Sequence, residues 1–202
     1  DISKFNREVI SDVGNVSNTT YVNEMISRTL SRFNSVDILV NNAGVLRPTP
    51  IIDITEEEWD FVVTGNLKTT FLCSKSVIPI MQKRGWGRII NISSSAGKNI
   101  STIGGAHYTA AKAAVLGFTR HMAKEVAEFG ITVNALCPGL IDTEMVRSTI
   151  TPQRTTEYAD SFPIQRLGKP KEIADLVNFL SSEQAAYITG ASIDINGGDL
   201  MI

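Results

Sequence analysis

Hydrophobic positions follow two different periods along the chain, and the two alternate. Between residues 19 and 34 apolar side chains recur three and four positions apart, which predicts an amphipathic helix. Runs dense in Ile, Val and Leu predict buried strands at 36–42, 87–93, 131–139 and 190–198, and we expect a short strand at 7–13. Further helices are predicted at 66–84, 107–129 and 169–181, and one begins after Thr55.

Local signals mark several helix ends. Thr55 precedes three glutamates, which predicts an N-cap followed by an acidic first turn. Gly130 is expected to end the helix at 107–129, and Pro170 suits the first turn of the next predicted helix.

The alternation of strands and helices predicts a single α/β domain over residues 1–202, with helices on both faces of a parallel sheet. One stretch, about 141–168, is irregular and rich in Thr, Pro, Arg and Ser. It directly follows a predicted strand, and ligands bind at that end of the strands in open α/β sheets. We therefore expect this stretch to be a mobile lid over a substrate.

Composition narrows the class of protein. The 202 residues are 43% hydrophobic and 20% charged, with a net charge of -2, so we expect a soluble protein without a nucleic-acid partner. No run is apolar enough for a membrane span. Cys73 and Cys137 lie in apolar runs, which predicts reduced thiols and a cytoplasmic location. The histidines, 107 and 121, lack metal-ligand spacing, so we expect no metal.

Tyr108 and Lys112 carry the most informative chemistry in the chain. Residues four apart lie on the same face of a helix, so the ammonium can approach the phenol. A phenol with a pKa of about 10 is a poor base at neutral pH, and a nearby cation favours the phenolate. Three serines, 93–95, end the predicted strand upstream. The sequence thus predicts a site where a phenol, an ammonium and a hydroxyl meet, with Lys112 lowering the Tyr108 pKa.

Seven motifs in chain order resemble those of the short-chain dehydrogenase/reductase family. They are Asn41-Asn-Ala-Gly44, Asn66, Asn91-Ile-Ser-Ser, Tyr108-x-x-x-Lys112, Pro138-Gly-Leu-Ile-Asp-Thr143, Arg166-Leu-Gly-Lys-Pro170 and Ile188-Thr-Gly with Asn196-Gly-Gly198. The resemblance implies a Rossmann-type doubly wound parallel sheet and a nicotinamide cofactor. It also implies a catalytic set of Ser94, Tyr108, Lys112 and Asn66.

Each catalytic residue has a role implied by this resemblance. Tyr108 exchanges the proton of the substrate oxygen, and Ser94 holds that oxygen by a hydrogen bond. Lys112 bonds the nicotinamide ribose, while the exposed carbonyl of Asn66 binds a water that links Lys112 to solvent. Ser94 is preferred because it lies three residues before Gly97, as in the family pattern. The loop to the tyrosine is one residue longer than is common, so Ser95 stays an alternative.

The resemblance also implies three groups of cofactor contacts. The adenosine side is assigned to Asn41, Ala43 and Gly44, the adenine to Asp12 and Val13, and the nicotinamide carboxamide to Pro138, Gly139, Ile141 and Thr143, with Tyr108 and Lys112 beside the ribose. Simple turn chemistry is the alternative for the asparagines, and a strand-end carboxylate is the alternative for Asp12. Asp1 would accept hydrogen bonds from a ribose 2′-hydroxyl and repel a 2′-phosphate, which favours NAD over NADP.

The glycine-rich loop Gly-x-x-x-Gly-x-Gly of the family does not occur between a strand and a helix in this sequence. We expect the first βα unit, roughly 30 residues, to precede Asp1. Only five residues separate Asp1 from Arg7, whereas a crossover with its helix needs at least about 10–12. We therefore expect a second missing piece between about Phe5 and Arg7.

The leading functional prediction is an NAD(P)-dependent oxidoreductase that interconverts a ketone and a secondary alcohol. The pattern is most similar to 3-oxoacyl-[acyl-carrier-protein] reductases, and a sugar or polyol dehydrogenase of the glucose type is the alternative. A binding or scaffold protein without catalysis is the alternative of another class, although all four catalytic positions are present. The family resemblance further implies a homotetramer, formed through the helices at 66–84 and 107–129 and the C-terminal strands.

Overall fold

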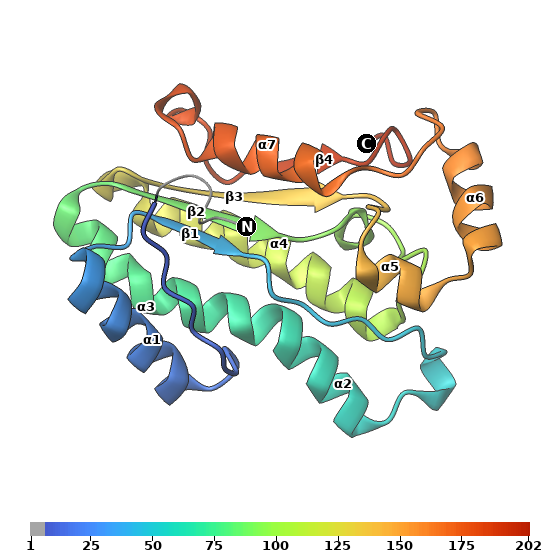
Figure 1. Cartoon of the computed structure of the whole chain (residues 1–202), viewed down its shortest axis with the longest axis horizontal. Coiled ribbons are helices and arrows are strands. Elements are labelled where there is room, and N and C mark those ends of the chain that lie inside the picture. Colours follow the sequence, from blue (N-terminus) through green and yellow to red (C-terminus); the bar gives the residue numbers. More distant parts are fainter. Residues whose placement is uncertain (1–6) are drawn as a thin grey trace.

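Four parallel strands form the central sheet of the protein (Figure 1). The structure is a computed structural model that describes residues 7–202. The strands are β1 (Ile38–Asn41), β2 (Gly87–Ile92), β3 (Ile131–Pro138) and β4 (Ser192–Ile195), in the order β1-β2-β3-β4. All three neighbouring pairs are parallel. The predicted parallel sheet is confirmed.

Helices cover both faces of this sheet, as the strand composition predicted. Figure 1 shows α1, α3 and α4 on one face and α7 on the other. The helices are α1 (Thr19–Phe33), α2 (Glu56–Val63), α3 (Thr69–Arg84), α4 (Ala106–Val126), α5 (Glu144–Thr149), α6 (Pro152–Ser161) and α7 (Pro170–Leu180). Among these described helices, none combines the length and the apolar character needed to cross a bilayer.

Two hydrophobic clusters hold the three layers together. The larger cluster joins the sheet to α1, α3 and α4, and its largest fully buried side chains include Met81, Ile89 and Ile131. The smaller cluster joins the other face to α7 through Ile90, Leu136 and Leu180. The side chains of the neighbouring residues Ile89 and Ile90 point to opposite faces of the sheet, because successive side chains alternate along a strand. A strand packed on both faces therefore reads as a continuous hydrophobic run.

The predicted helix ends hold in the structure. The Thr55 hydroxyl accepts a hydrogen bond from the Glu58 backbone N–H (3.2 Å), so Thr55 is the N-cap of α2. Gly130 adopts φ 70° and ends the turn that follows α4, a conformation that favours glycine. Pro170 opens α7.

Two segments differ from the sequence prediction. Residues 7–13 form no strand, because Asp12 turns to α1 and accepts hydrogen bonds from Tyr21 and Arg28. The stretch 141–168 is not irregular, since it contains α5 and α6. The Thr151 hydroxyl accepts from the Arg154 N–H (3.2 Å) and Pro152 occupies the first turn, which are helix-start signals that the prediction missed.

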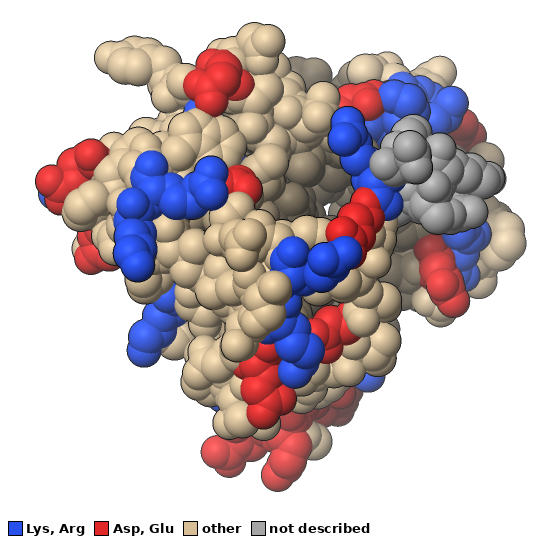
Figure 2. All heavy atoms as spheres, turned by 60° about the vertical axis from the view of Figure 1, so that its left-hand side comes forward, with Lys and Arg blue, Asp and Glu red and all other residues tan. Residues whose placement is uncertain are grey.

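Charged side chains of both signs are interspersed over the face shown in Figure 2. That distribution agrees with the net charge of -2. Surface ion pairs such as Lys171–Asp175 (2.7 Å) are exposed on both partners, so each contributes little to stability.

A buried polar network fixes the carboxyl ends of β1 and β2. The Asn41 amide donates to Ser74 Oγ (3.0 Å) and to Asn91 Oδ1 (2.8 Å). Asn91 in turn donates to Thr119 Oγ1 (2.8 Å), which donates to the Val115 carbonyl. These bonds connect two strands with α3 and α4, because each buried amide needs partners in the interior.

Replacing Asn91 by alanine is expected to lower the free energy of unfolding by about 1–3 kcal/mol, because Asn41 and Thr119 each lose a buried partner. Urea denaturation followed by circular dichroism measures the change. The exposed Asn99→Ala serves as the control and should change stability by less than about 0.5 kcal/mol. Equal stability of the two variants would contradict a stabilising role for the network.

Candidate active site

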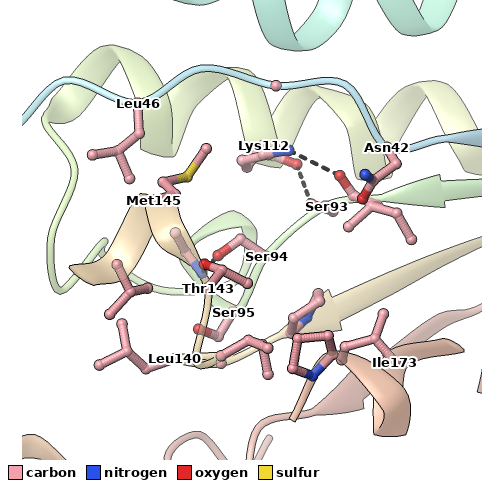
Figure 3. A pocket seen from close by; sticks show the side chains of 18 of the residues that line it. Asn42, Leu46, Ser93, Ser94, Ser95, Lys112, Leu140, Thr143, Met145 and Ile173 are labelled. Atoms are coloured by element: carbon pink, nitrogen blue, oxygen red, sulfur yellow. Dashed lines mark hydrogen bonds between the residues drawn. The ribbon is translucent and has the colours of Figure 1, made fainter. Parts of the chain in front are cut away.

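A cleft of about 820 Å³ lies at the carboxyl ends of the strands. Its walls come from the segments after β1, β2 and β3 and from α4 and α7, and Figure 3 shows side chains from these segments converging on it. Parallel strands deliver their C-terminal loops to one edge of the sheet, which is where open α/β folds bind ligands. The residues that the sequence prediction assigned to a site after β2 and β3 therefore meet in one place.

Tyr108 and Lys112 both line this cleft from the first turns of α4. The Lys112 ammonium lies 5.6 Å from the centroid of the Tyr108 ring and donates a hydrogen bond to the Ile92 carbonyl (2.8 Å). Lys112 is buried, and burial lowers its pKa to about 8. The predicted approach of the ammonium to the phenol is thus present in the described structure.

The pKa of Tyr108 shifts in the direction opposite to the sequence prediction. Burial raises the pKa of the phenol, and hydrogen bonding with Ser94 lowers it by less. The Lys112 ammonium is bonded to the Ile92 carbonyl. The pKa of Tyr108 is therefore raised and not lowered, because burial disfavours the phenolate more than hydrogen bonding with Ser94 favours it. The contribution of Lys112 to this pKa stays a prediction.

The three serines after β2 have separate environments. Ser93 is buried and its hydroxyl donates to the Lys112 backbone carbonyl (2.8 Å), a bond drawn in Figure 3. Ser94 accepts a hydrogen bond from the Ala96 N–H (3.1 Å) and interacts with the Tyr108 phenol. Ser95 also lines the cleft. Of the three hydroxyls, that of Ser94 affects the Tyr108 pKa, and the choice of Ser94 as the catalytic serine stays a prediction.

Asn66 lies in a π-helical turn, Thr64–Lys68, between α2 and α3. Its side-chain amide donates to the carbonyls of Val45 and Val62, both at 2.8 Å. The predicted helix at 66–84 consequently begins as α-helix only at Thr69, because the wide turn lets the Asn66 side chain reach back.

The carbonyl groups of Asn66 are not exposed as predicted. Asn66 is 1% exposed, and its backbone carbonyl accepts a hydrogen bond from Thr70 Oγ1 (3.0 Å). Its side-chain Oδ1 is buried and has no hydrogen-bond partner among the described residues. A Cβ at Gly44 would lie 2.8 Å from this Oδ1 and 3.5 Å from the Lys112 ammonium nitrogen. The glycine therefore leaves room for the oxygen and the cation to approach each other.

The predicted cofactor residues fall into two groups. Those that line the cleft are Gly44, Tyr108, Lys112, Pro138, Gly139, Ile141 and Thr143. Asn41 and Ala43 are not among the lining residues, and the Asn41 amide is occupied in the buried network. Asn42, to which the prediction assigned no cofactor contact, does line the cleft. The side chain of Asn41, the last residue of β1, points the opposite way. The alternation of side chains along a strand is the sequence signal that could have indicated this difference between Asn41 and Asn42.

Asp12 and Val13 do not reach the cleft in the described structure. Asp12 forms an ion pair with Arg28 (2.7 Å), and hydrogen bonds from Arg28 and Tyr21 lower the pKa of its carboxyl group. Val13 is 92% exposed. The remaining predicted contact, Asp1, lies outside the described residues.

The two cysteines and His107 have reactive side chains, and all three are buried in the described structure. Cys73 and Cys137 are free and buried. His107 is completely buried. Among residues 7–202, no three side chains of the metal-ligating types come together to hold an ion.

Comparison with known proteins decides which family this site belongs to. A family profile described as enoyl-(acyl carrier protein) reductase matches residues 3–199. The 3-oxoacyl-[acyl-carrier-protein] reductase of Vibrio cholerae is 45% identical over 188 residues, which cover 93% of this chain and 76% of the relative. The corresponding protein of Synechocystis is 42% identical and covers 96% and 77%.

The chain belongs to the short-chain dehydrogenase/reductase family. It is an oxidoreductase, and the predicted family and fold are confirmed. A crystal structure of a 3-oxoacyl-[acyl-carrier protein] reductase from Brucella melitensis superimposes with a TM-score of 0.88 at 35% identity, over 94% of this chain and 71% of that one. A second Brucella melitensis structure, described as having bound NAD, gives a TM-score of 0.86 at 34% identity and the same coverage.

The burial of Lys112 predicts a measurable effect on the stability of this short-chain dehydrogenase/reductase. The pKa is about 8 in the folded protein and 10.5 in the reference state, so between these pH values the unfolded chain binds more protons and wild-type stability rises with pH. Lys112→Met should be more stable than the wild type at pH 7, by about 1–3 kcal/mol. Urea denaturation at pH 7 and pH 10 tests this, and a difference that does not shrink at pH 10 would contradict it.

Proposed function

We propose that this protein reduces the 3-keto group of an acyl thioester to a hydroxyl group, with a nicotinamide nucleotide as the hydride source. The observation that carries the proposal is the convergence of Tyr108, Ser94 and Lys112 on one cleft. The names of the similar proteins, 3-oxoacyl-[acyl-carrier-protein] reductases, support this substrate class.

The residues of the cleft fit a nicotinamide nucleotide. The buried Oδ1 of Asn66 has no hydrogen-bond partner among residues 7–202, so it can accept a hydrogen bond from a ligand. The Lys112 ammonium is a donor close to it. Gly139 lets the segment after β3 pass close to Asn196, because a Cβ there would lie 2.9 Å from Asn196 Cα. Lys112 and Asn42 would hold the ribose side, and Thr143 the carboxamide side. When bound, the cofactor supplies the hydride.

NAD is the proposed cofactor, with NADP as the alternative. The structure described as having bound NAD, which is 34% identical to this chain, supports this choice. The second argument, the carboxylate of Asp1, rests on a residue outside the described range.

Tyr108 would act as the general acid of the reduction. Burial raises the pKa of its phenol, so the proton is retained at neutral pH and is available to the substrate oxygen as charge develops there. The Ser94 hydroxyl interacts with the phenol and would hold the same oxygen. Lys112, 5.6 Å from the ring, would stabilise the phenolate that the transfer leaves behind. A raised phenol pKa suits reduction better than the reverse reaction, which needs the phenolate at the start.

The walls of the cleft favour an acyl substrate over a sugar. Leu46 and Met145 face each other at one end of the cleft, while Leu140 and Ile173 form another wall (Figure 3). A polyol would leave its hydroxyl groups without partners against such surfaces, at a cost for each. Val146 of α5 also lines the cleft, which supports a role of residues 141–168 in covering the substrate.

We further propose that the protein acts in the cytoplasm as a homotetramer. Phe71 and Phe118 pack edge to face (6.2 Å) on the outer surfaces of α3 and α4. They line a shallow apolar groove with Leu67 and Ala114, which supports pairing through these helices. The buried free thiols of Cys73 and Cys137 support a reducing compartment.

Replacing Tyr108 by phenylalanine is expected to lower kcat for reduction of an acetoacetyl thioester about 10²- to 10⁴-fold, because the general acid is removed. Loss of NADH or NADPH absorbance measures the rate in the full-length protein. Cofactor affinity, measured by fluorescence titration, should change less than about threefold because the ring and Lys112 remain.

Tyr187→Phe is the matched control, since Tyr187 is fully exposed. Its activity should equal that of the wild type. Preferential oxidation of glucose by the wild type would favour the sugar dehydrogenase, and failure to bind either nucleotide would favour the scaffold protein.

A further inference from the structure

A buried imidazole, paired with a partly exposed carboxylate, lies directly behind the proposed general acid. His107 precedes Tyr108 in α4 and is 0% exposed. Its Nε2 lies 3.0 Å from Glu58 Oε1 of α2, and its ring stacks with that of Trp59 at a centroid distance of 6.5 Å. Neither Glu58 nor His107 lines the cleft. A completely buried imidazole needs partners for both ring nitrogens, so the second nitrogen is informative.

The second nitrogen, Nδ1, accepts a hydrogen bond from the backbone N–H of Tyr108 (3.1 Å). A backbone N–H can only donate, so this bond assigns a lone pair to Nδ1. The proton of the neutral ring is therefore on Nε2, from where it is donated to Glu58. The carboxylate thus selects the one neutral tautomer of His107 that can bind the Tyr108 backbone.

Glu58 is itself held in place. Hydrogen bonding with Thr49, followed by that with His107, lowers the pKa of its carboxyl group and keeps it ionised. Its backbone N–H is bonded to the Thr55 cap of α2. The segment that contains Thr49 is also bonded to the start of α4, because the Gly105 N–H donates a hydrogen bond to the Arg47 carbonyl (2.7 Å). Three segments distant in sequence therefore meet at the residue before Tyr108.

We propose that Glu58 and His107 are positioning residues that set the direction of the Tyr108 phenol toward the substrate. The proposal rests on the proposed function of Tyr108 as the general acid. The Tyr108 N–H lies in the first turn of α4 and donates both to His107 Nδ1 and to the Gly105 carbonyl (3.1 Å). Backbone N–H groups in the first turn of a helix lack the carbonyl partner that later residues have. The imidazole supplies that partner. It fixes the backbone of Tyr108 from the side opposite the cleft.

The chain contains its own matched control. His121 and Glu125 lie further along α4 with the same Nε2–Oε1 distance of 3.0 Å, but their side chains are 75% and 64% exposed. An exposed pair of this kind contributes little. The sequence has only these two histidines, so a spectrum of the imidazole nitrogens contains two sets of signals, which His121→Asn assigns.

The first experiment reads the tautomer and does not depend on activity. Full-length protein labelled with ¹⁵N-histidine is measured by long-range ¹H–¹⁵N correlation at pH 7. We expect His107 as a single tautomer protonated on Nε2 in the wild type, and a mixture or a change of tautomer in Glu58→Ala. A wild-type His107 protonated on Nδ1, or a tautomer unaffected by Glu58→Ala, would overturn the proposal.

The second experiment reads the effect on Tyr108. His107→Phe keeps the ring but removes both hydrogen bonds, whereas His107→Asn places an amide oxygen close to the position of Nδ1. We expect kcat per cofactor-binding site to fall about 10- to 100-fold in His107→Phe, with KM changed less than about threefold, because small displacements of a catalytic group have effects of this size. His107→Asn should recover part of the loss, and His121→Asn should match the wild type.

Counting sites by cofactor titration separates positioning from simple loss of folded protein. Full kcat per site in His107→Phe, or equal losses in His107→Asn and His107→Phe, would overturn the positioning role. A wild type that binds the nucleotide but does not reduce the acetoacetyl thioester would overturn the proposed function instead. In that case the nitrogen spectra still decide whether Glu58 sets the tautomer of His107.

Discussion

Lys112 carries its ammonium into the interior between α4 and the end of β2, and the surrounding structure is arranged to receive it. The Ile92 carbonyl accepts one of its protons, and Ser93 donates to its backbone carbonyl. Gly97 allows the close approach, because a Cβ there would lie 2.8 Å from that carbonyl oxygen. A charge in such a place is unfavourable unless it is bonded. The bonds that Lys112 forms are thus part of the contact between α4 and the end of β2.

The same contact brings the chemistry together. Helix α4 supplies Tyr108 and Lys112 from adjacent turns, while the strand end supplies Ser94, so the relative position of the phenol and the hydroxyl depends on how α4 docks on β2. Buried amides farther along, at Asn41 and Asn91, connect the neighbouring strands to the same helix. The acid that we propose is thus held by bonds to elements on several sides.

Three polar side chains lie in the interior of the protein next to the cleft. His107, Asn66 and Lys112 all lie beneath or beside the cleft and are at most 5% exposed. Each occupies a buried position where a hydrophobic side chain would pack without needing hydrogen-bond partners. Their presence beside the cleft is typical of a site at which function takes precedence over maximal stability.

Local sequence patterns were enough to predict the parallel sheet, most helix ends and the pairing of Tyr108 with Lys112. These features depend on local rules, namely the period of apolar residues, the cap at Thr55 and the spacing of four residues within a helix. The motifs also indicated the family, because their order and spacing can be recognised in the sequence without any tertiary contact being known.

Only the tertiary structure decided which polar side chains face the cleft and what surrounds them. Asn41 and Asn42 are neighbours with the same side chain, yet one joins the buried network and the other lines the cleft. The burial of His107 required Glu58 from a helix 49 positions away, and the raised pKa of Tyr108 required the packing around it. Burial and hydrogen-bond partners come from segments distant in sequence, so a local pattern cannot specify them.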